Sequence, residues 1–162
     1  MVLDKRKRFT NKKEFLEWYN VVTEWSEDID YNDYRHTTSS LQNWFLAMKE
    51  IVPPLNGEFA PSDEDLGNGE FQEGDYCIAN EAIYVAFAWS DAEKVHPIVT
   101  NFAKKYDVAF FDISNNKVIY PDGFVLELSD DRNDTSNSFL KKLRNFFHLW
   151  KFAFHLGNNT ST

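Results

Sequence analysis

The chain has 162 residues, of which 43% are hydrophobic and 17% aromatic, with one cysteine and a formal net charge of −9. This length suits one domain with its own hydrophobic core, and a single cysteine excludes an internal disulfide and a multi-cysteine zinc site. Because no apolar run approaches the roughly 18–20 residues that span a bilayer, and no secretory signal is evident, we expect a cytoplasmic protein that does not bind membranes.

The first predicted elements are a short strand that ends at residues 2–3 and a helix. Asn11 is the expected helix cap, with Glu14 three residues further on in capping-box spacing. Apolar side chains then recur at helical spacing and predict one buried stripe. They are Phe15, Trp18, Tyr19, Val22 and Trp25.

A second helix is predicted after a polar, acidic stretch at residues 26–36. Thr38 is its expected cap, and the proline pair at 53–54 stops it because proline cannot donate the helical hydrogen bond. Its apolar stripe consists of Leu41, Trp44, Phe45, Met48 and Val52. The next segment, 53–75, reads as irregular and carries seven carboxylates without a Lys or Arg. Loops of more than about 20 residues are uncommon in compact domains and are often functional.

The rest of the core region predicts strands and one more helix. Strands are expected at 76–80, 83–88, 107–113, 117–120 and 124–128, with turns between the first two strands and between the last three. Ser90 and Glu93 have capping-box spacing and predict the start of a third helix, in which Pro97 is a site for a kink. Its expected buried face is formed by Ala92, Val95, Val99, Phe102 and Ala103.

These elements predict an α+β fold in a single domain. The expected core domain spans residues 1–128 and has a mainly antiparallel sheet of about four to six strands, with the helices on one face. Residues 129–137 are a predicted linker, and 138–156 form a C-terminal amphipathic helix that is apolar almost all round. Such a helix packs on the same domain or on a partner, and a homodimer through it is one alternative. The expected core also includes Trp89 and Phe110.

No motif in the chain predicts catalysis, a cofactor or a metal site. The glycine-rich signatures that bind phosphates are absent. The segment 28–32 begins like a calcium loop, but Asp33 stands where that loop needs glycine and Ser39 where it needs glutamate. We therefore expect a protein that is not an enzyme and needs no cofactor. An uncharacterised hydrolase that uses scattered carboxylates stays open as an alternative.

Charge is distributed unevenly along the chain. Residues 1–13 carry a net +5, residues 14–134 carry −18 and residues 135–162 carry +4. An acidic body repels nucleic acid and attracts basic partners. The same charge also serves solubility alone, and the sequence leaves both interpretations open.

Several ordered segments resemble a known protein family. They are FLEWY at 15–19, TEWSE at 23–27, YND at 31–33, WFLAM at 44–48, PPLNG at 53–57, DYCI at 75–78, IYVAFAWS at 83–90 and VAFFDIS at 108–114. Together they are similar to small acidic bacterial cytoplasmic proteins encoded near polymorphic or contact-dependent toxins. The resemblance covers roughly residues 2–114, and the stretch from about 124 departs from it.

The resemblance implies an immunity protein, which binds a cognate toxin and has no chemistry of its own. Together with the charge, it predicts a basic, nuclease-type toxin partner that is blocked by acidic occlusion. The expected contact residues lie in two acidic segments and are Glu27, Asp28, Asp30, Tyr31, Asp33, Tyr34, Asp63, Glu64, Asp65, Glu70, Glu73 and Asp75. A regulatory or adaptor domain with a ligand pocket between sheet and helices is the alternative.

Overall fold

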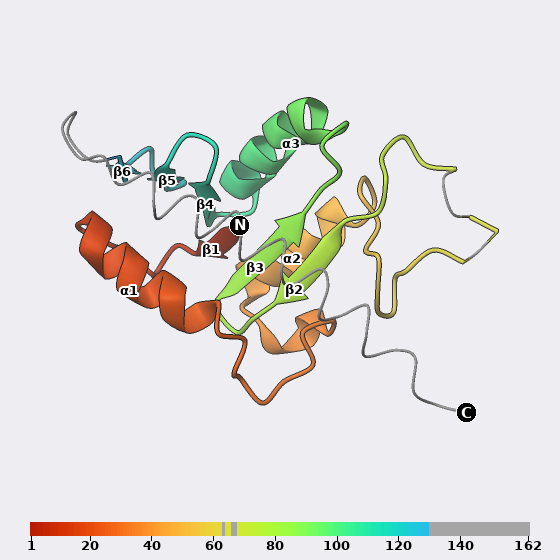
Figure 1. Cartoon of the computed structure of the whole chain (residues 1–162), viewed down its shortest axis with the longest axis horizontal. Coiled ribbons are helices and arrows are strands. Elements are labelled where there is room, and N and C mark those ends of the chain that lie inside the picture. Colours follow the sequence, from red (N-terminus) through yellow and green to blue (C-terminus); the bar gives the residue numbers. More distant parts are fainter. Residues whose placement is uncertain (63, 66–67, 130–162) are drawn as a thin grey trace. The chain divides into compact units, whose positions relative to one another are not determined.

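Six antiparallel strands form one sheet in the order β2-β3-β1-β4-β5-β6 (Figure 1). The computed structural model describes residues 1–62, 64–65 and 68–129. The strands are β1 (Val2–Asp4), β2 (Asp75–Ile78), β3 (Ala82–Ala86), β4 (Val108–Asp112), β5 (Lys117–Ile119) and β6 (Val125–Glu127). The helices are α1 (Lys12–Val22), the 3₁₀ turn η1 (Tyr34–His36), α2 (Ser39–Met48) and α3 (Ala92–Lys105).

The predicted α+β class and antiparallel sheet are confirmed for the described part of the chain. All five predicted later strands form within a few residues of their expected bounds. The turn before β6 has Gly123 at φ 91°, a conformation that glycine adopts without strain. The predicted linker beyond residue 129, the helix at 138–156 and its suggested dimer contact lie outside the described residues.

The weakest strand signal belongs to a central strand of the sheet. In β1, Val2 lies opposite Ile83 of β3 on one side and opposite Phe110 of β4 on the other. Both Val2 and Leu3 are fully buried, although they point to opposite faces. A strand of three residues is too short to show an alternation of apolar and polar residues. Its position in the sheet is therefore evident only from the strands that pair with it.

Helix α1 begins as predicted and ends sooner. The amide of Glu14 donates to Asn11 Oδ1 at 3.0 Å, which confirms the cap. The helix ends at Val22, and Trp25 has a φ of 50°, which a right-handed helix cannot contain. The prediction that Trp25 extends the helical stripe is therefore wrong. Its ring instead packs edge-on against Tyr31 in the following loop.

The helices cover both faces of the sheet, so the prediction that they share one face is wrong. Neighbouring residues of a strand point to opposite faces, and β4 carries Phe110 and Phe111 in succession. The ring of Phe111 lies 4.7 Å from Phe15 and 5.6 Å from Tyr19, both on α1. Phe110 belongs to the core cluster that α2 and α3 form on the other face. Apolar residues on both faces of β4 require this arrangement.

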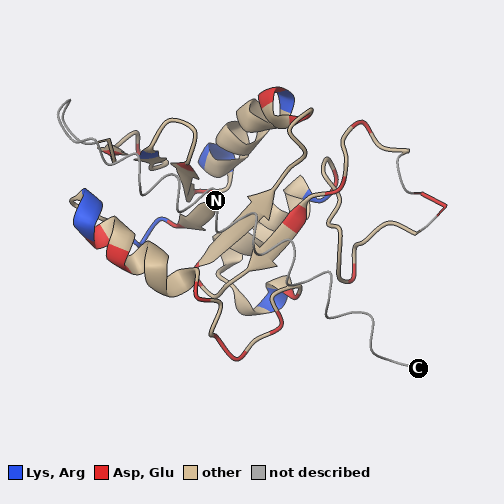
Figure 2. Ribbon diagram, viewed as in Figure 1, with Lys and Arg blue, Asp and Glu red and all other residues tan. Residues whose placement is uncertain are grey.

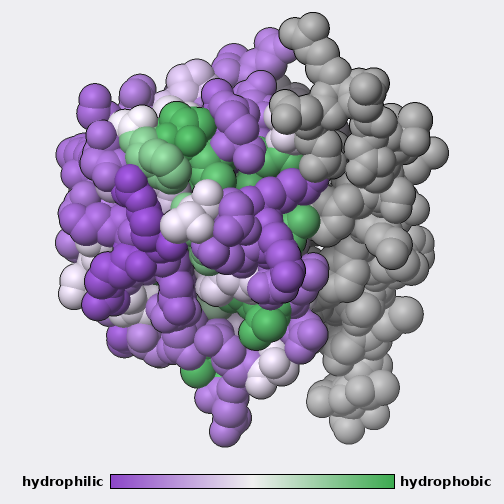
Figure 3. Space-filling model, turned by 90° about the vertical axis from the view of Figure 1, so that its left-hand side faces the viewer, coloured by the Kyte–Doolittle hydropathy of each residue, from purple (hydrophilic) through white to green (hydrophobic). Residues whose placement is uncertain are grey.

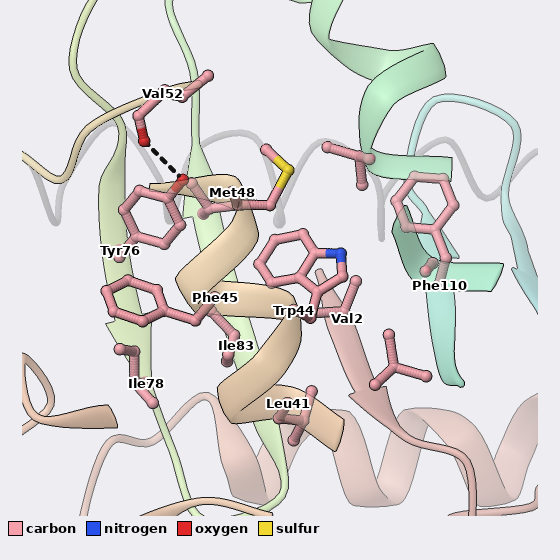
Figure 4. Close-up of a cluster of buried hydrophobic side chains, with 14 of the residues drawn as sticks. Val2, Leu41, Trp44, Phe45, Met48, Val52, Tyr76, Ile78, Ile83 and Phe110 are labelled. Carbon is pink, nitrogen blue, oxygen red and sulfur yellow. Dashed lines mark hydrogen bonds between the residues drawn. The ribbon is translucent and has the colours of Figure 1, made fainter. Parts of the chain in front are cut away.

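The main core lies between the sheet and α2 with α3 (Figure 4). The predicted stripe of α2 is confirmed, because all five of its residues are buried. Val52 lies beyond the end of the helix but stays in the core, where its carbonyl accepts a hydrogen bond from the Tyr76 hydroxyl at 2.9 Å. Each large buried side chain of this kind contributes about 1.5–3 kcal/mol to folding.

Helix α3 starts at Ala92 as expected, but its predicted capping box does not form. Asp91 is the cap residue, and its side chain makes no hydrogen bond to the helix. One carboxylate oxygen accepts instead from the amide of Gln72 at 3.0 Å, and the other from the Ser90 hydroxyl at 3.3 Å. The prediction of a core position for Trp89 is also wrong, since this side chain is 90% exposed.

The basic segment near the start of the chain is paired with carboxylates from distant parts of the fold. The ion pairs are Lys5–Asp107, Arg6–Asp4, Lys7–Glu81 and Arg8–Asp122. The Arg6 guanidinium holds the pKa of the Asp4 carboxyl below its usual range. The pairs of Lys5, Lys7 and Arg8 are exposed and contribute at most about 1 kcal/mol each, whereas the carboxylate of Asp4 is buried. Their positive charge is nevertheless balanced by carboxylates within the chain.

Candidate functional site

The two acidic segments predicted to bind a partner are in contact where residues 32–35 of the first meet residues 57–59 of the second. A Cβ atom on Gly57 would lie 3.1 Å from the Cβ of Asn32, so the two backbones touch. The Tyr34 and Phe59 rings pack with centroids 5.8 Å apart, and Arg35 forms an ion pair with Glu58. Helix α2 lies between the two segments in the sequence.

Hydrogen bonds within the chain hold several carboxylates of the first segment. Glu27 accepts from the backbone amide of Asn80 at 3.2 Å and from its side chain at 2.8 Å. Asp33 caps η1 by accepting from the Arg35 amide at 2.9 Å. Asp30 accepts from the Asn32 amide at 2.9 Å. Asp28 and Asp30 are exposed, whereas Glu27 and Asp33 are half-buried and have a structural role in the loop.

The first segment also covers the edge of the sheet at β2. The amide of Ile78 donates to the Tyr31 carbonyl at 2.9 Å, and the His36 Nε2 atom lies 3.1 Å from the Ile78 carbonyl. An uncovered edge strand invites pairing with other chains, and a loop that binds its free groups prevents this. The segment therefore cannot move far from the sheet without exposing these groups.

The second segment presents its charge to solvent. Glu64, Asp65 and Glu70 are exposed, Glu73 and Asp75 are half-buried, and the predicted contact residue Asp63 lies outside the described residues. At the base of the segment, Gly74 donates to the Pro53 carbonyl at 2.8 Å, which closes the loop. Figure 2 shows carboxylates along both segments and few basic residues beside them.

The two tyrosines among the predicted contact residues are packed against other residues of the protein. Tyr34 stacks on Phe45 with centroids 5.5 Å apart, and the Tyr31 hydroxyl accepts from the Glu27 amide at 2.8 Å. The exposed aromatic residue of this region is Trp89. The hydrogen bond between Gln72 and Asp91 holds the second acidic segment against the turn that contains Trp89.

Trp89 directly follows the apolar run at 83–88, which favours a core position, so its exposure was not predicted. A local signal was present. Trp89 follows the end of β3 and comes directly before the polar pair Ser90-Asp91, which is typical of a turn. Side chains in such a turn are covered only where another element packs over them.

The lone cysteine is structural. Cys77 is buried in β2, and burial, with the nearby carboxylates of Asp75 and Glu27, raises the pKa of its thiol to about 12. Only the thiolate attacks electrophiles. We expect iodoacetamide at about pH 8 to alkylate Cys77 at least about 100-fold more slowly in the folded protein than in concentrated urea. Mass spectrometry over a time course measures both rates, and equal rates would show that the thiol is accessible.

A cavity of about 160 Å³ forms a second candidate site, between α3 and the sheet. Its inner wall includes Val2 and Trp44, which are fully buried, and its outer wall includes the half-exposed His96. Nε2 of His96 lies 3.1 Å from Asp112 Oδ2. Burial favours the protonated form of Asp112, but hydrogen bonds from Asn115 and His96 outweigh it and hold the pKa of Asp112 below its ordinary value.

Other kinds of site find little support among the described residues. Within residues 1–62, 64–65 and 68–129, no group of three or more His, Cys, Asp or Glu side chains lies close enough to hold a metal ion. No helix in the same part of the chain is both long enough and apolar enough to cross a membrane. The face that carries α1 and β6 is mostly hydrophilic, with small separate hydrophobic patches (Figure 3).

Comparisons with protein-family models, curated proteins and solved structures gave no match.

Proposed function

We propose that this chain is an immunity-type protein that binds a basic bacterial toxin domain and blocks its substrate surface. The observation that carries the proposal is the contact between two acidic segments, 26–36 and 53–75, at residues 32–35 and 57–59. A nuclease holds nucleic-acid phosphates with Lys and Arg side chains. A surface of carboxylates competes for those same side chains and speeds capture by long-range attraction.

The charges best placed for contact are the exposed ones. They are Asp28 and Asp30 in the first segment and Glu64, Asp65 and Glu70 in the second. Glu27 and Asp33 support these charges by fixing the loop. Trp89, next to the second segment, supplies an exposed aromatic side chain of the kind that dominates binding energy at protein interfaces. The family resemblance supports the same function.

The test measures binding to the protein encoded next to this chain, and relief of its toxicity when both are expressed together. The acidic variant is Asp28→Asn/Glu64→Gln/Glu70→Gln, and the control variant is Glu17→Gln/Glu93→Gln/Glu127→Gln. Both remove three exposed charges, so they differ only in position. We expect the acidic variant to bind at least about tenfold more weakly and the control to stay within about twofold.

Salt provides a second measurement on the same pair. Isothermal titration at about 50 and 500 mM NaCl should show weaker binding by the native chain at high salt, because screening shortens the reach of the carboxylates. If the acidic variant still relieves the toxicity completely, the acidic segments are not part of the interface. No binding at either salt concentration would overturn the proposed function for this pair.

A further inference from the structure

The long loop between α2 and β2 contains both of the Asn-Gly pairs that occur in the sequence. They are Asn56-Gly57 and Asn68-Gly69. In such a pair the glycine nitrogen can attack the side-chain amide of the asparagine, because glycine has no Cβ atom to hinder the approach and its backbone adopts many conformations. All four residues are exposed, so exposure alone predicts the same reactivity at both pairs.

Contacts with distant parts of the chain hold the first pair. Gly57 has a φ of 88°, and a Cβ atom there would lie 3.1 Å from the Cβ of Asn32 in the first acidic segment. The Gly57 carbonyl accepts from the Ala60 amide at 3.2 Å. On the other side of the pair, the Leu55 amide donates to the Gly74 carbonyl at 2.8 Å. Because ring closure between asparagine and glycine rotates the peptide that joins them, these contacts must open before the first pair reacts.

The second pair contacts its own stretch of chain. The amide of Asn68 donates to the Asp65 carbonyl at 3.2 Å, and its side-chain nitrogen donates to the Glu64 carbonyl at 3.0 Å. A Cβ atom on Gly69 would meet the backbone of Phe71, two residues further on. Ring closure at this pair therefore rearranges a local turn and leaves the contact between the two acidic segments in place.

We propose that Asn68 is a site of spontaneous deamidation in the folded protein, whereas the fold protects Asn56. The Gly69 nitrogen gives its proton to a solvent base and bonds to the side-chain carbonyl carbon of Asn68. The bond from this carbon to the amide nitrogen breaks, and that nitrogen takes a proton from water and leaves as ammonia. Water then opens the cyclic imide to an aspartate or an isoaspartate.

Each deamidation adds a negative charge to the second acidic segment, between the exposed carboxylates of Asp65 and Glu70. The modification itself does not depend on a partner. Only its effect on binding rests on the proposed function, because an added carboxylate strengthens the attraction of a basic surface. The experiment therefore follows the modification alone, and its failure would leave the proposed function untouched.

The test compares the two pairs in the native full chain, incubated at mildly alkaline pH either folded or in concentrated urea. Cleavage after glutamate separates the pairs, since Glu58 and Glu64 lie between them, and mass spectrometry measures the loss of each asparagine over time. In the folded chain Asn68 should react at least about tenfold faster than Asn56, because the contacts of the first pair open only rarely. In urea the two rates should agree within about threefold, since these contacts are lost.

The control variant is Gly69→Ala, which adds a methyl group beside the attacking nitrogen in an exposed stretch. It should slow the reaction of Asn68 at least about tenfold and leave the rate of Asn56 unchanged. The proposal is overturned if Asn68 does not react in the folded native chain, if Asn56 reacts equally fast there, or if the difference between the two persists in urea. Loss of Asn68 at the native rate in Gly69→Ala would overturn it as well, because the amide would then be hydrolysed without ring closure.

Discussion

Replacing Trp44 with alanine is expected to lower the free energy of unfolding by about 3–5 kcal/mol, the range found for large aromatic residues in cores. Trp44 of α2 is fully buried, in one cluster with Val2 of β1 and Phe110 of β4. Its removal takes a large apolar surface out of the core and leaves a void that joins the existing cavity. The surrounding strands pair on both sides and cannot close over this space.

The control is Trp89→Ala, the same chemical change at a side chain that is 90% exposed. It should change the free energy of unfolding by no more than about 0.5 kcal/mol, as is usual for surface positions. Urea unfolding followed by circular dichroism gives both values from the midpoint and slope. Equal losses for the two variants would contradict the burial of Trp44 and the exposure of Trp89.

Replacing Phe111 with alanine is expected to cost about 3–5 kcal/mol as well, and to release α1 in particular. Phe111 is the residue of β4 that faces α1, where its ring meets those of Phe15 and Tyr19 in edge-on geometry. Aromatic pairs of this kind add about 0.5–1.5 kcal/mol each to the burial of their surface. Among the described residues, the ring contacts of Phe111 are with Phe15 and Tyr19 of α1, so its loss is expected to act mainly on that face of the sheet.

Hydrogen exchange distinguishes this result from general destabilisation. The amides of α1 should lose more protection in Phe111→Ala than those of α2, because α2 packs on the opposite face. Phe124→Ala serves as a control, since this phenylalanine sits in the turn before β6 and is 38% exposed. A uniform loss of protection in α1 and α2 would contradict the two-sided packing.

The proposed partner site needs exposed charge on loops that stay in place. The contacts of Asn32 with Gly57 and of Tyr34 with Phe59 hold the two acidic segments together at their point of contact.

The sequence by itself determined the features that depend on neighbours along the chain. The period of Leu41, Trp44, Phe45 and Met48 predicted the buried face of α2, and Asn11 with Glu14 predicted the start of α1. The turn at Gly123 marked a hairpin. Helical periodicity, caps and turns act over a few residues, so their signals are complete within a short window of sequence.

Only the tertiary structure decided which distant groups meet. It placed the three-residue strand β1 near the centre of the sheet, assigned α1 to the face opposite α2 and α3, and left Trp89 exposed. In the structure the Asp91 carboxylate accepts a hydrogen bond from the Gln72 amide and does not cap its own helix. The two acidic segments are in contact. Hydrophobic burial is non-directional. An apolar pattern therefore predicts that a residue is buried, but not which element packs against it. That choice depends on the packing of the whole sheet.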